Sequence, residues 1–204
     1  MKTTLILLLL PFACLSARAQ SAGEADRQLL QTIKEANAAC TSITAAFRQT
    51  RHLPALGENT LSEGLFYYRK PAQMAMKYTR PEGDVLLING SRITLTSGGK
   101  ERKISPRNAR MEGLRTILAA CLQGDAAQMG AAKITCAKQG QTLVAVADID
   151  GKQNRSGISR VIVCYAAAAG HPPVSIQTIE PDGSYTLYEL SGIRLNEAIP
   201  ENMF

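Results

Sequence analysis

The sequence predicts an α+β protein in which most of the chain forms an antiparallel β-sheet and two helices cover one face of that sheet. Two observations predict this class. Short runs of alternating apolar and polar residues, separated by turn residues, recur along the chain, and two segments instead carry the three-and-four spacing of an amphipathic helix. A sheet of roughly nine such strands would curl or close on itself, and its concave side is the natural place for the helices.

The first nineteen residues are expected to form a leader that is removed. Lys2 precedes an apolar run, Leu5 to Leu15, and Ala17-Arg18-Ala19 fits a cleavage signal of small residues. The run is short for a membrane span, so retention as an anchor is the less favoured alternative. We expect cleavage before Gln20, export, and a single domain over residues 20–204.

The charge of the expected mature chain gives no sign of a nucleic-acid partner. It has 185 residues (204 minus 19), 21 bases (23 minus Lys2 and Arg18) and 17 acids, a net charge of +4. The densest basic cluster, Lys100 to Arg110, has no aromatic residue interleaved with it. We interpret it as a solvated face.

The two expected helices lie near the start and the middle of the domain. Residues from Ala22 to Cys40 place apolar side chains three and four positions apart. The second helix carries a stripe of Met111, Leu114, Leu118, Cys121 and Leu122, with Ile117 at its margin.

Strand patterns fill the rest of the chain. A run at residues 41–50 is followed by a predicted loop at Arg51 to Thr60. Gly64 to Lys70 and Gln73 to Thr79 form a pair around Pro71, with Met74, Met76 and Tyr78 on one face of the second strand. Further strands are expected around the Asn89-Gly90 turn and at Lys133–Lys138, Thr142–Asp148, Ile158–Tyr165, Val174–Glu180 and Ser184–Leu190.

The cysteines predict disulfides rather than a metal site. Four remain after cleavage, Cys40, Cys121, Cys136 and Cys164, and no CxxC or Cys/His spacing indicates zinc. An even count in an exported chain favours one or two disulfides, whose pairing stays open, and free buried thiols are the alternative. No metal is expected.

Catalytic chemistry lacks its usual residues. The two histidines, His52 and His171, stand beside prolines in predicted loops and share no spacing with another ligand or base. The sequence contains neither a GxSxG motif nor a glycine-rich phosphate loop. We therefore expect a binding protein and not an enzyme.

Two stretches resemble the periplasmic lipoprotein-carrier family, the LolA-like proteins. They run from Ala45 to Leu95 and from Thr178 to Phe204. The matching features occur in the family's order: Phe47-x-Gln49, Gly64, a base before Pro71, Pro81, a strand ending at Asn89-Gly90, and a final Asn196-x-x-Ile199 followed by Phe204.

The resemblance implies a strongly curved, incomplete β-barrel with helices as a lid over a cavity for acyl chains. It implies a carrier without cofactor or reaction, which takes acylated lipoproteins or a related lipid from an inner-membrane release complex to an outer-membrane receptor. Methionine and aromatic side chains suit such a cavity. The expected lining is Phe47, Phe66, Tyr68, Met74, Met76 and Tyr78 from the strands and Leu114, Ile117 and Leu118 from the helix.

One residue departs from the family pattern. The family has an arginine directly before the first proline, where it helps to latch the lid, and this chain has Lys70. Lysine cannot form the same planar fork, so a different cargo is conceivable. Three functions are weighed: a monomeric lipid carrier, a periplasmic sensor or protein-interaction module on the same scaffold, and, least favoured, an enzyme.

Overall fold

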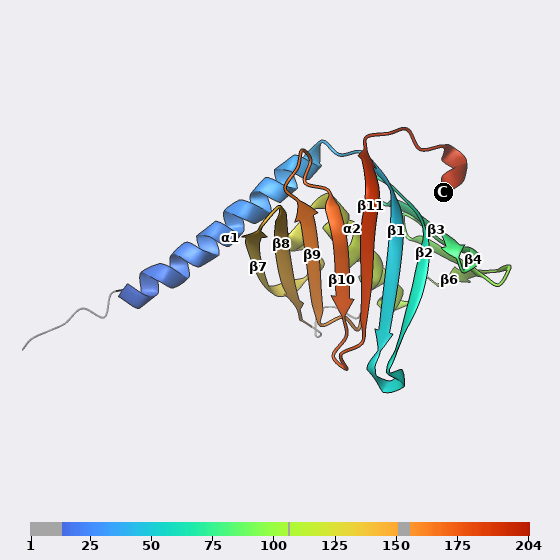
Figure 1. Ribbon diagram of the computed structural model, residues 1–204, viewed down its shortest axis with the longest axis horizontal. Helices are drawn as coiled ribbons and strands as arrows, with labels where there is room; N and C mark the ends of the chain where they lie inside the picture. Colours follow the sequence, from blue (N-terminus) through green and yellow to red (C-terminus); the bar gives the residue numbers. More distant parts are fainter. Residues whose placement is uncertain (1–13, 106, 151–155) are drawn as a thin grey trace, which may run out of the picture.

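Eleven strands form one open antiparallel sheet in the computed structural model, which describes residues 14–204 except 106 and 151–155, and side chains from residue 23 onward. Their order is β6-β5-β4-β3-β2-β1-β11-β10-β9-β8-β7 (Figure 1). The strands are β1 (Ser42–Leu53), β2 (Glu58–Arg69), β3 (Gln73–Arg80), β4 (Glu82–Asn89), β5 (Arg92–Ser97), β6 (Lys100–Ile104), β7 (Ala131–Gln139), β8 (Thr142–Ile149), β9 (Arg160–Ala166), β10 (Pro173–Ile179) and β11 (Tyr185–Leu195).

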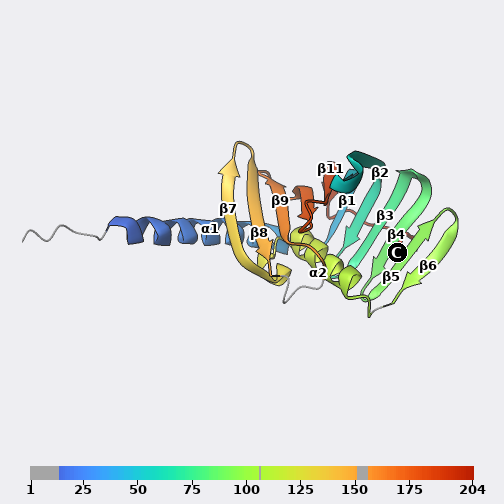
Figure 2. The same cartoon turned by 90° about the horizontal axis from the view of Figure 1, so that it is seen from below.

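The sheet consists of two consecutive meanders, β1–β6 and β7–β11, joined where β1 pairs with β11. This pairing sets Phe47 opposite Leu190 and Gln49 opposite Tyr188. The sheet curves around helix α2 (Ala109–Gln123), which lies on its concave side (Figure 2). The predicted fold class, a curved and incomplete barrel with helical cover, is confirmed.

Helix α2 has clear sequence signals at both ends. The Asn108 side chain accepts a hydrogen bond from the Met111 backbone amide at 3.1 Å, which caps the first turn. Gly124 ends the helix in the left-handed conformation, at φ 65°. A side chain at Gly124 would also meet Ile33 of helix α1 (Cys14–Ala38) at 2.8 Å, so glycine permits the close contact between the helices.

The core lies between the inner face of the sheet and the two helices. Its most buried side chains, each at most 1% exposed, include Ile33 from α1, Ile117 and Leu122 from α2, and Val161 and Tyr165 from β9. Burial of one such aliphatic side chain contributes about 1.5–3 kcal/mol. No helix among the described residues is long and apolar enough to cross a bilayer.

Several sequence predictions need correction. The predicted loop at Arg51 to Thr60 is mostly strand, because β1 runs to Leu53, a single 3-10 turn follows at Pro54–Leu56, and β2 begins at Glu58. Part of the basic cluster, Lys100–Ile104, forms the edge strand β6, which has no counterpart among the predicted strands. Ile117 is fully buried, so it lies within the apolar stripe of its helix and not at the margin of that stripe.

The predicted leader lies mostly outside the described residues, which begin at residue 14. Helix α1 starts at Cys14 and continues through the expected cleavage point before Gln20. Cleavage therefore stays a prediction.

Candidate functional site

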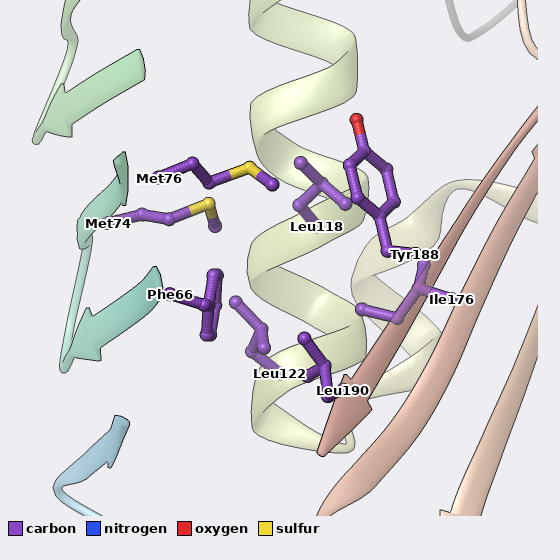
Figure 3. Close-up of a pocket in the computed structure, with 8 residues that line it drawn as sticks. All are labelled: Phe66, Met74, Met76, Leu118, Leu122, Ile176, Tyr188 and Leu190. Atoms are coloured by element: carbon purple, nitrogen blue, oxygen red, sulfur yellow. The ribbon is translucent and has the colours of Figure 1, made fainter. Parts of the chain in front are cut away.

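A small apolar cavity lies between α2 and the inner face of the sheet. Its volume is about 20 Å³. Side chains from β2 and β3, from α2, and from β10 and β11 point into it from three directions (Figure 3). The lining residues are Phe66 from β2, Met74 and Met76 from β3, Leu118 and Leu122 from α2, Ile176 from β10, and Tyr188 and Leu190 from β11.

Local geometry explains this convergence. Phe66 stands opposite Met76 in the β2–β3 ladder, and Tyr68 stands opposite Met74, so the four side chains form two adjacent cross-strand pairs on one face. Leu118 and Leu122 are four residues apart on α2 and point to the same side. The flexible side chains of Met74 and Met76 therefore face Leu118 and Leu122 across the cavity.

The predicted lining residues are divided among several places. Four of the nine, Phe66, Met74, Met76 and Leu118, line the cavity. Tyr68 borders a separate cavity of about 10 Å³ beside Arg115. The other four, Phe47, Tyr78, Leu114 and Ile117, do not line this cavity.

Phe47 and Tyr78 pack against each other on the inner face, with ring centroids 5.1 Å apart and ring planes at 86°. The Tyr78 hydroxyl donates to the Gln49 side chain at 2.8 Å. Leu114 lines a neighbouring polar pocket, and the fully buried Ile117 borders neither the cavity nor that pocket. The predicted set therefore covers only part of the interior, and the cavity shares four residues with it.

Sequence reasoning missed Leu122, Ile176, Tyr188 and Leu190 as lining residues. Ile176 lies in the predicted strand Val174–Glu180, and Tyr188 and Leu190 lie in the predicted strand Ser184–Leu190. Tyr188 and Leu190 are two positions apart, which is a signal of a shared face. What the pattern does not contain is the β1–β11 pairing that brings this face opposite β2 and β3.

A second, larger pocket adjoins the first at Tyr188. It has a volume of about 280 Å³ and lies near the first turn of α2. Glu180 is central to it, because this carboxylate lies 2.7 Å from the Arg110 guanidinium and 3.5 Å from that of Arg51. The candidate site therefore has an apolar compartment and a charged one.

Lys70 lies against the C-terminal end of α1. Its ammonium donates to the backbone carbonyls of Asn37 at 2.7 Å and Ala38 at 3.1 Å, two acceptors in the last turn that have no partner within the helix. The preceding residue, Arg69, holds the C-terminal segment through a bidentate pair with Glu201 and a stacking contact with Phe204. One turn thus contacts both a helix and the chain end.

The predicted disulfides are absent, since all four cysteines with described side chains are free. Cys40, Cys121 and Cys136 are buried as small side chains of the core. Burial raises the pKa of the Cys136 thiol to about 11 and raises that of Cys121 further. An even count of cysteines carries no information on whether their side chains meet.

The titratable groups of the interior are phenols and thiols. Burial raises the pKa of Tyr68 and of Tyr188 to about 12, so both stay neutral. Among the described side chains, no group of three or more His, Cys, Asp or Glu residues is placed to hold a metal ion. The arrangement is suited to holding an apolar ligand.

Comparison with solved structures finds the same fold in other bacterial proteins. The chain is similar to a provisionally assigned outer membrane lipoprotein-sorting protein domain from Vibrio parahaemolyticus, with a TM-score of 0.50, 12% identity, and coverage of 88% of this chain and 95% of that one. It is also similar to a DUF1329 family protein from Desulfovibrio piger, with a TM-score of 0.51, 10% identity, and coverage of 90% and 97%. At these identities the likeness shows a shared fold alone.

Comparison by sequence is more specific. No curated protein matches the chain. A family described as outer membrane lipoprotein carrier protein LolA matches residues 38–204, a range that contains all eleven strands, α2 and the C-terminal segment. Because the match extends over more than half of its length, this chain belongs to the family of the outer membrane lipoprotein carrier protein LolA.

Proposed function

We propose that the protein is a carrier that binds the acyl chains of lipoproteins, or of a related lipid, between α2 and the inner face of the sheet. The observation that supports this is the apolar cavity that Met74, Met76 and Leu118 help to line, in a member of a lipoprotein carrier family. Its walls offer contacts to an apolar chain and contribute no charged group.

The energetics favour such a ligand once the site opens. Burial of one methylene is worth about 0.8 kcal/mol, so a chain of about sixteen carbons offers on the order of 10 kcal/mol before costs. A cavity of about 20 Å³ holds no more than a water molecule. Loading therefore requires α2 to separate from the sheet, and unbranched methionines can then adapt to the chain.

The proposed route follows the family. The chain is exported, its leader is removed before Gln20, and the monomeric carrier moves its cargo through the periplasm from an inner-membrane release complex to an outer-membrane receptor. In this role it catalyses no reaction and needs no cofactor.

Native mass spectrometry of protein purified from its own periplasm tests the proposal. We expect bound lipid or lipopeptide on the wild type and on Met76→Ala, which enlarges the cavity, and none on Met76→Glu, which puts a charge into it. Leu65→Glu is the matched control, since Leu65 is 45% exposed on the strand that pairs with β3 and points to the outer face. Empty wild-type protein that also takes up no acylated peptide would refute the carrier proposal.

One observation favours a second candidate, a sensor or protein-interaction module on the same scaffold. The interior is nearly filled, as that function requires, and the sheet leaves the edge strands β6 and β7 unpaired on one side. Such a module would bind its partner without an acyl group. Binding of non-acylated protein by wild type and Met76→Glu alike would support it.

A further inference from the structure

The inner face changes from apolar to charged over three successive rows of side chains. One row contains Phe47 on β1 and Leu190 on β11. The next contains Gln49, Tyr188 and Ile176, and the one after it contains Arg51, Thr186 and Thr178. Rows on one face are two residues apart along a strand, so the change is complete within about 14 Å.

The charged end of this gradient is the pocket of about 280 Å³ that Tyr188 shares with the apolar cavity. Arg51 enters it from β1 and Arg110 from the first turn of α2, so the two guanidinium groups come from opposite sides. The Arg51 guanidinium also donates to the Thr186 hydroxyl at 3.1 Å. In the described chain, these two cations share one carboxylate, Glu180.

Two guanidinium groups and one carboxylate give this cluster a net positive charge, and they leave N–H donors that a ligand can use. Each guanidinium has more N–H donors than these contacts use, and its planar fork matches the two oxygens of a carboxylate or phosphate. The Arg51 contact to Glu180 is long, at 3.5 Å, while the Arg110 contact is 2.7 Å. An incoming oxyanion can therefore engage Arg51 first and compete with Glu180 for Arg110.

We propose that this pocket binds the anionic head group, a phosphate or carboxylate, of an amphiphile whose acyl chain enters the adjoining apolar cavity. The inference rests on the proposed carrier function and adds a preference for negatively charged cargo. Tyr188 lies at the boundary between the two compartments, because it lines both the apolar cavity and the polar pocket. Thr186 lines the polar pocket with it. The polar pocket already has room for a head group, whereas the tail compartment must open.

Two probes with the same twelve-carbon tail separate head group from chain: dodecyl phosphate, which is anionic, and 1-monododecanoylglycerol, which is neutral. We would measure their dissociation constants by isothermal titration below the concentration at which they form micelles, at low and high salt. Wild-type protein should bind the phosphate about tenfold more tightly than the neutral probe, as one or two charge-assisted hydrogen bonds predict. High salt should reduce that preference.

Single substitutions in the pocket should change the affinity for dodecyl phosphate in opposite directions. Arg51→Gln and Arg110→Gln should each reduce dodecyl phosphate binding about tenfold and leave the neutral probe unchanged. Glu180→Gln should strengthen phosphate binding, because it removes the competing carboxylate, and general destabilisation cannot produce that opposite effect. Arg48→Gln, on the outer face of the same strand as Arg51, is the matched control and should change neither affinity.

The other outcomes would overturn the inference. Equal binding of both probes by wild type, or equal losses for both in the arginine variants, would refute the head-group pocket and leave the carrier proposal standing. Tight binding of inorganic phosphate alone, with displacement of dodecyl phosphate, would assign the pocket to a free anion. Failure of wild type to bind either probe would refute the carrier proposal itself.

Discussion

Gly64 on β2 is closely approached by residues of both neighbouring strands, β1 and β3. An added Cβ would be 2.2 Å from the carbonyl oxygen of Lys77 on β3 and 2.8 Å from Cε1 of Phe47 on β1. The β2–β3 ladder is irregular at this point, between Glu63 and Gly64. Glycine is therefore required by space and not by backbone conformation, and Phe47 covers the position that a side chain would occupy.

Replacement of Gly64 by alanine should lower the free energy of unfolding by about 2–3 kcal/mol, because neither the Lys77 carbonyl nor the buried Phe47 ring can move away cheaply. Urea denaturation measures this loss. Gly23→Ala is the control, since nothing lies within 4 Å of a Cβ added there in α1, and it should be neutral or slightly stabilising. An equally stable Gly64→Ala protein would contradict the close approach.

At the scale of the residue, the sequence pattern predicted four of the eight side chains that line the apolar cavity. Alternation is a local property, and it correctly placed Met74 and Met76 together on the buried face of β3. Whether a buried side chain borders empty space depends on neighbours from distant strands. Phe47 and Met76 therefore look alike in sequence, although Met76 lines the cavity and Phe47 packs on Tyr78.

At the scale of the element, helix α1 is held at its C-terminal end by one side chain from a strand turn. Lys70 supplies a cation to the Asn37 and Ala38 carbonyls, which are also at the negative end of the helix dipole. Lys70 directly precedes Pro71, the position at which the resemblance implies an arginine in the family. Whether it serves as a lid latch is a prediction that follows from this contact.

Lys70→Met, which keeps the apolar stem and removes the ammonium, should destabilise the protein by about 1 kcal/mol and speed hydrogen exchange in the last turns of α1. Lys70→Arg should retain the slow exchange, because its guanidinium can reach the same carbonyls. Exchange mass spectrometry on peptides covering residues 30–40 measures both. Lys138→Met, an exposed lysine on β7, is the control, and a Lys70→Met protein that matched it would exclude the latch.

The errors in the predicted elements also have physical reasons. Pro54 and Gly57 correctly indicated a turn, but the polar residues on either side are strand, because β1 and β2 pair as far as Leu53 and Glu58. The polar ends of these strands are stabilised by pairing with the neighbouring strand, which the local sequence pattern does not show. The basic cluster is a solvated face, as predicted, because residues 100–103 are exposed on the edge strand β6. The strand itself was not predicted, since a run of exposed charges shows no alternation.

At the scale of the whole molecule, the buried phenols link stability to alkaline pH. Burial holds the pKa of Tyr68 and Tyr188 at about 12, against an ordinary value near 10 in the unfolded chain. Because the folded-state pKa is raised, the stabilisation is complete below pH 10 and is lost as pH rises towards 12. The fold should weaken over that window as the unfolded state gives up protons more readily.

We expect the free energy of unfolding to fall by about 1 kcal/mol per buried tyrosine between pH 9 and pH 11. Tyr68→Phe should show a smaller fall and should also be more stable at neutral pH, since the Tyr68 hydroxyl is buried without a hydrogen-bond partner among the described residues. Urea denaturation at a series of pH values measures both effects. Tyr67→Phe, on the outer face of the same strand, is the control, and an identical pH profile for the two variants would contradict the assignment.

The overall shape could be predicted only in part. Many antiparallel strands with two helices indicated a curved sheet with helical cover, and the family resemblance supplied the incomplete barrel. The opposition of β2 and β3 to β10 and β11 depends on the β1–β11 ladder, which joins residues about 140 positions apart, such as Phe47 and Leu190. No local pattern encodes a contact of that length, and the lining residues of β10 and β11 were missed for this reason.

Helix α2 has a position in the chain that matters for how the molecule could signal its state. The strand before it, β6, and the strand after it, β7, are the two outermost strands of the sheet, so this one helix connects opposite rims. In the proposed loading step, movement of α2 away from the sheet would act on the chain segments that lead to both rims. A membrane-bound partner that touched both rims could distinguish a loaded molecule from an empty one without reaching the cargo.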